Sequence, residues 1–301
     1  MFKGSIVALI TPFRDGELDE TAFRALVEWQ VSQGTHGLVP CGTTGESPTL
    51  SHAEDMRLVR LCVEAANGRV PVIAGTGSNS TREAISLTRH GKEAGADAAL
   101  IVTPYYNKPT QDSLYQHYRA IHDEVELPII IYNIPGRCVV DMSVETMARL
   151  AELPNIVGVK DATQDLARPL RTRLTIGPDF CQLSGEDPTA VPFLAQGGHG
   201  CISVTANVAP KLCAEMHEAW QAGDLDTVAR RNETLTPLHL ALFAETSPGP
   251  VKYAASLLGL CSEECRPPLY GVSERTKETV RRAMAEVGLL AQPEAAAGVL
   301  P

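Results

Sequence analysis

A repeat constrains the fold of this 301-residue chain more than any other feature: a short apolar segment followed by an amphipathic helical pattern. Repeated strand–helix units predict a parallel sheet with helical crossovers, and eight such units close into a (β/α)8 TIM barrel. An open doubly wound sheet is the competing fold, but its first turn is usually rich in glycine. Here the first turn, residues 11–13, contains none, which favours the barrel. The predicted strands are residues 5–9, 37–40, 70–74, 98–102, 129–132, 156–160, 181–183 and 200–204.

Capping patterns mark the helices between these strands. The Ser-x-x-Glu pattern of a capping box occurs at residues 51–54 and 80–83. Further N-cap candidates, and glycines placed to end helices, are Asp19, Thr110, Ser143, Gly34, Gly68, Gly95 and Gly197.

After about residue 205 the pattern is helical only, with helices predicted over 208–221, 225–243, 250–258 and 274–287. We therefore predict a catalytic barrel over residues 1–224. A C-terminal helical region over 225–301 would complete the chain, with a flexible tail from about residue 292.

Charge and hydropathy exclude several classes of function. The net charge of −10 argues against sequence-independent binding to nucleic acid or to an anionic membrane. No apolar run approaches the roughly 20 residues that span a bilayer. Residues 1–10 carry a lysine and an apolar run, but residues 11–14 (Thr-Pro-Phe-Arg) replace the small residues of a signal-peptide cleavage site. These observations predict a cytoplasmic protein.

The cysteines and histidines do not form a metal-binding pattern. Eight of each are scattered along the chain, without a Cys-x-x-Cys pair. Cys261 and Cys265 are one helical turn apart, but no matching histidine cluster follows, so we expect reduced thiols and no metal site. Residues 75–79 (Gly-Thr-Gly-Ser-Asn) lack the third glycine and the lysine of nucleotide-binding loops, so we interpret them as a turn.

Lys160 stands at the end of an apolar strand that has no obvious use for it. Side chains alternate along a strand, so Gly158 and Lys160 share one face while Asp161 points to the other and is not the ion-pair partner of Lys160. We expect Gly158 to leave empty volume beside the lysine stem. A lysine without hydration disfavours its ammonium form, and the neutral amine forms Schiff bases with carbonyl groups. The alternative is a lysine that extends from the strand end into solvent.

The other strand ends add polar groups, since active sites of such barrels lie at the C-terminal ends of the strands. Residues 41–47 (Cys-Gly-Thr-Thr-Gly-Glu-Ser) offer hydroxyls and free N–H groups for a carboxylate, or form an ordinary tight turn. Loops 103–109 and 132–137 hold three of the seven tyrosines, which relay protons or simply pack at the mouth. Arg137 provides a carboxylate-binding fork, or is a surface arginine.

Two acids follow the seventh strand. We interpret Glu186 and Asp187 as the start of the next helix, where the macrodipole favours acids, although an acidic pair at the site is the alternative. Taken together, the strand ends predict carbonyl chemistry without a metal or cofactor.

These motifs resemble a known family from residue 4 to about 290. The chain is similar to the pyruvate-dependent class I aldolases related to N-acetylneuraminate lyase, and within them to the dihydrodipicolinate synthase branch. The resemblance rests on residues 42–47, 75–77, 103–107, 132–137, 158–160 and 198–207.

The resemblance implies a reaction. Pyruvate would form an imine with Lys160, and the derived enamine would attack the aldehyde of L-aspartate 4-semialdehyde. The product would be 4-hydroxy-tetrahydrodipicolinate, in the first committed step of lysine and diaminopimelate biosynthesis. We expect a lyase of the carbon–oxygen hydro-lyase class that needs no cofactor.

The resemblance also assigns residues. Thr44, Tyr132 and Tyr106 match a proton relay, in which Tyr106 reaches the neighbouring site across a dimer interface, and a homotetramer built as a dimer of dimers is expected. Substrate contacts would come from Thr43 and Thr44 for the pyruvate carboxylate, Arg137 for the semialdehyde carboxylate, and Gly185 and Ile202 for the pocket wall.

Feedback inhibition by L-lysine is a further family feature. The matching positions are Ser47, His52, Asn79, Glu83 and Tyr105. Pro48 departs from the pattern, and Asp55 stands where inhibited relatives often carry a histidine, so we expect weak to moderate inhibition. Asp161, which is glutamate in many relatives, and Cys138 are milder departures.

Two alternatives remain. A lyase acting on a sugar acid would also use Lys160 and Tyr132, but the paired threonines and the Pro-Gly-Arg motif that ends at Arg137 disfavour it. A non-catalytic binding protein on a barrel scaffold is disfavoured because no catalytic position is missing.

Overall fold

The structure is a computed structural model that describes residues 1–291. Within that range eight parallel strands form one sheet in the order β4-β1-β10-β9-β8-β7-β6-β5. The two ends of the sheet meet, because Leu38 of β4 forms a parallel bridge with Val72, just before β5. This closure confirms the predicted TIM barrel. The strands are β1 (Gly4–Ala8), β4 (Gly37–Val39), β5 (Ile73–Gly75), β6 (Ala98–Val102), β7 (Ile129–Asn133), β8 (Ile156–Asp161), β9 (Cys181–Ser184) and β10 (Gly200–Ser203).

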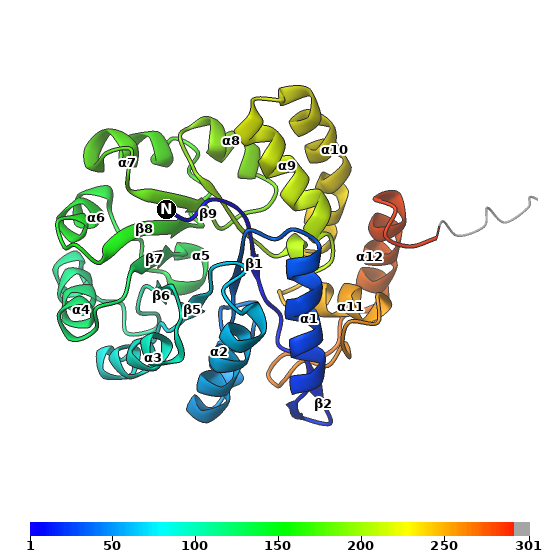
Figure 1. Ribbon diagram of the computed structural model, residues 1–301, viewed down its shortest axis with the longest axis horizontal. Helices are drawn as coiled ribbons and strands as arrows, with labels where there is room; N and C mark the ends of the chain where they lie inside the picture. The colour runs from blue at the N-terminus through cyan, green and yellow to red at the C-terminus, as the bar shows by residue number, and fades with distance from the viewer. Residues whose placement is uncertain (292–301) are drawn as a thin grey trace, which may run out of the picture.

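Helices surround the strands as a ring (Figure 1). The interior of the barrel is filled by apolar side chains from alternate strand positions, among them Ile6, Ile130, Leu183 and Ile202. The ring consists of α1 (Glu20–Ser32), α2 (His52–Ala66), α3 (Thr81–Ala94), α4 (Gln111–Glu124), α6 (Val144–Ala151), α7 (Arg168–Ile176), α8 (Ala190–Ala195) and α9 (Pro210–Ala222). Two short segments, α5 (Pro135–Cys138) and the 3-10 helix η2 (Thr205–Asn207), follow β7 and β10.

Three further helices follow the barrel: α10 (Leu225–Ala241), α11 (Gly249–Leu257) and α12 (Glu274–Glu286). In Figure 1 they lie beside α9 and α1. Leu235 and Leu238 of α10 share one hydrophobic core with Val208 and Cys213 of the barrel. The predicted helical extension is therefore present and packed, whereas the division into two domains at residue 224 stays a prediction. The tail predicted from residue 292 lies outside the described residues.

Local predictions were correct in most places. The Ser51–Glu54 capping box is formed, and Asp19, Thr110 and Ser143 each cap a helix. The second predicted capping box is wrong: Ser80 makes no side-chain cap bond, and its N–H donates to Ser78 Oγ (3.0 Å) rather than to Glu83. Glu83 instead accepts a hydrogen bond from Ser78 Oγ (2.8 Å).

Two differences from the predicted strands have local causes. Strand β5 begins three residues later than predicted, since Pro71 has no N–H for the sheet ladder. A hairpin of β2 (Phe13–Arg14) and β3 (Glu17–Leu18) was not predicted, because two-residue strands carry no periodicity. Among residues 1–291, no helix combines the length and apolarity needed to cross a membrane.

Candidate active site

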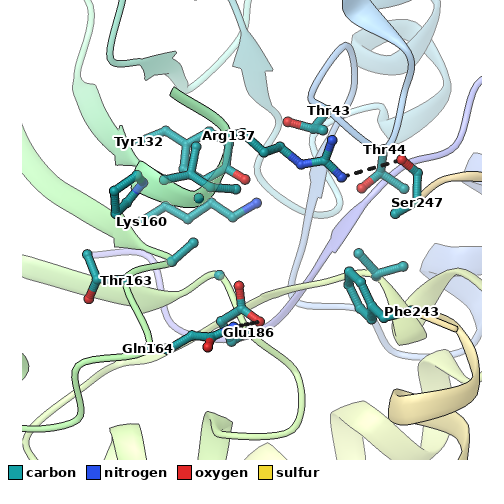
Figure 2. A pocket seen from close by; sticks show the side chains of 16 residues that line it. Thr43, Thr44, Tyr132, Arg137, Lys160, Thr163, Gln164, Glu186, Phe243 and Ser247 are labelled. Atoms are coloured by element: carbon teal, nitrogen blue, oxygen red, sulfur yellow. Dashed lines mark hydrogen bonds between the residues drawn. The ribbon is translucent and has the colours of Figure 1, made fainter. Parts of the chain in front are cut away.

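A cavity of about 360 Å³ opens at the C-terminal ends of the barrel strands (Figure 2). Strand ends and their following loops supply most of its wall, as the barrel architecture requires. The lining residues are Thr43, Thr44, Tyr132, Ile134, Pro135, Gly136, Arg137, Lys160, Ala162, Thr163, Gln164, Gly185, Glu186, Val204, Phe243 and Ser247.

Lys160 projects into this cavity from β8. In the sheet it lies beside Tyr132 of β7 and Leu183 of β9, both members of the barrel-interior cluster. Only 6% of the lysine is exposed, so it does not extend into bulk solvent. Its Nζ lies 4.3 Å from the centre of the Tyr132 ring. Within the described part of the chain, no carboxylate lies within ion-pair distance of this nitrogen and no acceptor hydrogen-bonds to it. The amine is therefore buried, unpaired and open to a ligand in the cavity.

The room beside the lysine comes from a different glycine than predicted. A Cβ atom at Gly158 would lie 2.3 Å from the Cys181 carbonyl oxygen, so this glycine is required by the close approach of β9. A Cβ atom at Gly185 would lie 3.1 Å from Lys160 Cε and 2.8 Å from Ala162 Cβ. Gly185 therefore leaves space for the lysine stem, and the interpretation of Gly158 is wrong.

Asp161 points away from Lys160, as strand alternation predicts. Its carboxylate accepts hydrogen bonds from the Thr163 N–H (2.8 Å) and Oγ1 (2.7 Å), and Arg168 Nε lies 3.7 Å away. Burial raises the pKa of Asp161, while the bonds from Thr163 and the charge of Arg168 act against this rise. Asp161 thus organises the turn after β8 rather than the lysine itself.

The loop after β4 holds Thr43 and Thr44 at the cavity in a fixed conformation. Cys41 and Glu46, on either side of the threonines, have φ angles of 57° and 58°, a left-handed backbone that needs support from its surroundings. Thr11 Oγ1 provides part of this support by donating to the Gly45 carbonyl (2.7 Å). The two hydroxyls are therefore placed in advance for a ligand.

Arg137 lies at the end of α5, on the cavity wall. Its Nη2 donates to the Ser247 carbonyl at 3.5 Å, the one side-chain hydrogen bond this arginine makes among residues 1–291 (Figure 2). Most of its donors thus remain available to an anion. The contact brings the connection between α10 and α11, with Phe243 and Ser247, into the cavity wall. No sequence pattern indicates that these two residues reach the cavity, because their position depends on how the C-terminal helices pack.

The helix-start interpretation of Glu186 and Asp187 is wrong. Helix α8 begins later, at Ala190, and neither acid caps it. Asp187 instead accepts hydrogen bonds from the backbone N–H groups of Val204 (2.8 Å) and Thr205 (3.2 Å) and from the Ser203 hydroxyl, at the start of η2. Glu186 lines the cavity.

The comparison with known proteins gives the family. The sequence profile of the dihydrodipicolinate synthetase family matches residues 1–287. The 4-hydroxy-tetrahydrodipicolinate synthase of Rhodospirillum centenum is 72% identical over 290 residues, which cover 96% of this chain and 100% of the relative. The chain belongs to the dihydrodipicolinate synthetase family. This confirms the resemblance found in the sequence. Enzymes of this family are lyases of class EC 4.3.3.7, which belongs to the carbon–nitrogen lyases. The prediction of a lyase is therefore confirmed, and the predicted carbon–oxygen subclass is wrong.

Solved structures of the family agree with the fold. The chloride-inhibited dihydrodipicolinate synthase of Acinetobacter baumannii, complexed with pyruvate, is 47% identical with a TM-score of 0.94, covering 96% of this chain and 100% of that one. The enzyme of Cyanidioschyzon merolae with lysine bound is 38% identical with a TM-score of 0.93, covering 96% and 99%.

Two residues that the family resemblance assigned to the site do not line the cavity of the single chain. Ile202 is fully buried in the barrel interior with Tyr132. Tyr106 is 91% exposed, in a backbone conformation with φ of 71°, outside the cavity. A role for Tyr106 requires a second copy of the chain and stays a prediction.

The positions matched to lysine inhibition lie in neighbouring loops and helix starts. Asn79 Nδ2 donates to the Tyr105 carbonyl (3.2 Å), and burial, followed by the charge of Glu83, raises the pKa of Tyr105. Ser47 begins the 3-10 helix η1 (Ser47–Thr49), and His52 begins α2.

The departures from the family pattern lie apart from the cavity. Asp55 is 6% exposed on the inner face of α2, where burial raises its pKa to about 7, and Pro48 is exposed in η1. Cys138 is buried and does not line the cavity. Burial raises the pKa of its thiol, against the effects of Thr103 and Arg137.

Proposed function

We propose that this protein condenses pyruvate with L-aspartate 4-semialdehyde to give 4-hydroxy-tetrahydrodipicolinate, in the route to diaminopimelate and lysine. The observation that carries the proposal is the buried, unpaired Lys160 in a cavity that also holds Arg137 and the two threonines. The proposal is supported by 72% identity to a synthase of that name.

The first half of the reaction uses Lys160 as nucleophile. Its nitrogen attacks the keto carbon of pyruvate, water leaves, and an imine forms. The hydroxyls of Thr43 and Thr44 bind the pyruvate carboxylate, and the methyl group then loses a proton to give the enamine. Tyr132, whose ring lies beside the amine, moves protons together with Thr44 and with Tyr106 of a second copy.

Replacing Tyr132 by phenylalanine tests the proton relay. The ring beside Lys160 remains while the hydroxyl is lost, so we expect kcat to fall by the roughly 10²–10⁴-fold typical of general acid–base catalysis. Steady-state kinetics with both substrates measures this effect. An unchanged kcat in this variant would show that the Tyr132 hydroxyl is not part of the proton relay.

The second half of the reaction needs a site for the semialdehyde, and Arg137 supplies the carboxylate fork. Pyruvate consumption with aspartate semialdehyde should therefore exceed consumption with N-acetylmannosamine. The opposite order would favour the sugar-acid lyase.

Assembly and regulation belong to the same proposal. We expect a cytoplasmic homotetramer, built as a dimer of dimers, with weak to moderate L-lysine inhibition at Ser47, His52, Asn79, Glu83 and Tyr105. A relative's structure with lysine bound supports the inhibitor class. Analytical ultracentrifugation measures the assembly. If calorimetry finds no binding heat with millimolar lysine, the expected inhibition by lysine is wrong.

A further inference from the structure

Glu186 is the one acidic side chain among the described residues that line the active-site cavity. Figure 2 shows it reaching into the cavity opposite Arg137, with Lys160 between the two along the wall. Its neighbour Asp187 is buried and fully engaged with the start of η2. The two adjacent acids thus differ: Asp187 stabilises the start of η2, whereas the Glu186 side chain points into the cavity.

The contacts that the Glu186 carboxylate makes are too few for a structural role. Within residues 1–291 its side-chain carboxylate has one hydrogen bond, a long one of 3.5 Å from Gln164 Nε2, and no cation within ion-pair distance. The charged groups that face it are Asp187, Lys160 and Arg137. Burial, the largest cause, raises the pKa of Glu186, which makes its carboxylate a better proton acceptor than an exposed one. A half-buried carboxylate of this kind is suited to a cationic group of a ligand.

The proposed second substrate carries such a group. L-Aspartate 4-semialdehyde has an aldehyde, an α-carboxylate and an α-ammonium group. The enamine on Lys160 reacts with the aldehyde, and Arg137 binds the α-carboxylate. The α-ammonium group is left without a binding partner. We propose that Glu186 binds this α-ammonium group and accepts a proton from it, so that the freed amine can close the ring. The inference rests on the proposed function and adds a residue to it.

The proton balance of ring closure fits this role. After the carbon–carbon bond has formed, the pyruvate-derived carbon is still an iminium with Lys160, and the substrate nitrogen is an ammonium without a lone pair. Glu186 accepts one proton, and the amine attacks the iminium carbon, whose π electrons move to the Lys160 nitrogen. A second proton passes from the ring nitrogen to the Lys160 nitrogen. The ring lone pair then expels Lys160 as a neutral amine, and the product leaves as a cyclic iminium.

This assignment also gives the site a means of selecting its substrate. Arg137 and Glu186 together recognise the carboxylate and the ammonium of an α-amino acid. A sugar aldehyde offers hydroxyls in place of both charges, so it would leave the carboxylate of Glu186 without a cation.

The test replaces Glu186 by glutamine, which keeps the size and the bond to Gln164, and uses Glu145→Gln on the exposed face of α6 as the matched control. We expect Glu186→Gln to lower kcat/KM for aspartate semialdehyde by about 10²-fold, within the range of general base catalysis. The KM for pyruvate and borohydride trapping of the pyruvate imine should stay unchanged. Inhibition by 4-oxobutanoate, which lacks the amine, should be equal in wild type, variant and control.

Three outcomes distinguish the claims. A fall in kcat/KM of less than threefold, or an equal loss of 4-oxobutanoate affinity, overturns the role of Glu186 while leaving the proposed function intact. Failure of the wild-type protein to trap pyruvate overturns the proposed function itself. Loss confined to the amine-bearing semialdehyde supports the inference.

Discussion

Two buried lysines in this chain differ in whether a carboxylate pairs with the ammonium group. Lys160 is 6% exposed and Lys252, in α11, is fully buried, and each Nζ lies 4.3 Å from the centre of an aromatic ring, that of Tyr132 or Phe13. Lys252 Nζ, however, lies 2.7 Å from Glu46 Oε1, in an ion pair whose side chains are 0% and 1% exposed. Lys160 has no such partner among the described residues. Burial is common to both lysines, and the carboxylate is what separates them.

Burial alone does not make a lysine a nucleophile. A carboxylate at contact distance holds the ammonium form, which has no lone pair to attack a carbonyl. The Lys252–Glu46 pair has a structural consequence instead, since Glu46 also accepts a hydrogen bond from the Arg266 N–H (2.9 Å). Glu46 belongs to the loop that carries Thr43 and Thr44. In the proposed reaction Lys160 is the nucleophile, while Lys252 links the C-terminal helices to the loop of Thr43 and Thr44.

Lys160→Met gives the largest expected effect. The variant should lose condensation and imine trapping altogether, because Lys160 is the one lysine among residues 1–291 that lines the cavity. Its free energy of unfolding should change by less than about 1 kcal/mol, since no buried partner loses an ion pair. Activity assays and urea denaturation measure the two quantities. Strong destabilisation would show that Lys160 also has a structural role.

Lys252→Met should produce the opposite pattern. It leaves the buried carboxylate of Glu46 without its cation, so we expect the free energy of unfolding to fall by about 3–5 kcal/mol. The folded fraction should still trap pyruvate on Lys160. Urea denaturation and borohydride trapping test this together, and a variant as stable as wild type would contradict the structural role.

Asp55 extends the comparison to a buried acid without a lysine partner. Burial raises its pKa from 3.8 to about 7, so between those values the unfolded chain releases a proton that the folded chain keeps. The contribution of Asp55 to the free energy of unfolding therefore falls as the pH rises between these two pKa values. The total fall is about 4 kcal/mol.

Asp55→Asn should remove this slope and be more stabilising at pH 8 than at pH 5. Unfolding free energies of both proteins across pH 4–8 measure the difference. Parallel curves would show that Asp55 ionises normally in the folded chain.

The double variant Glu46→Gln, Lys252→Met gives the smallest expected effect. Removing both charges leaves no unpaired ion, and glutamine keeps an acceptor for the Arg266 N–H. Replacing a whole buried pair is often close to neutral, so stability should return to within about 1–2 kcal/mol of wild type. A double variant as unstable as Lys252→Met alone would mean that packing, rather than charge, explains the single loss.

The parts that the sequence predicted are those governed by local pattern. Strand β6, the capping box at Ser51 and the position of Lys160 at a strand end follow from periodicity and alternation. The parts that it missed depend on residues far apart in the chain. Glu46 and Lys252 are 206 positions apart, and neither has a pattern that indicates the other.

Glu186 was misassigned for a related reason. An acid shortly before a helix fits the macrodipole rule, but the side chain turns into the cavity. Gly158 was misassigned because the sequence does not show how closely the Cys181 carbonyl approaches. Packing between β8 and β9 decides the position of Gly158, and the turn after β9, where the Glu186 N–H donates to Ser184 Oγ, holds the backbone of Glu186.

Borohydride reduction in the presence of pyruvate, followed by peptide mass mapping of wild type and Lys160→Met, identifies the lysine that forms the imine. We predict a modified residue at Lys160 in wild type and no modified lysine in the variant. Modification of Lys252, or of any other lysine at the level of Lys160, would contradict the claim that the unpaired lysine is the nucleophile.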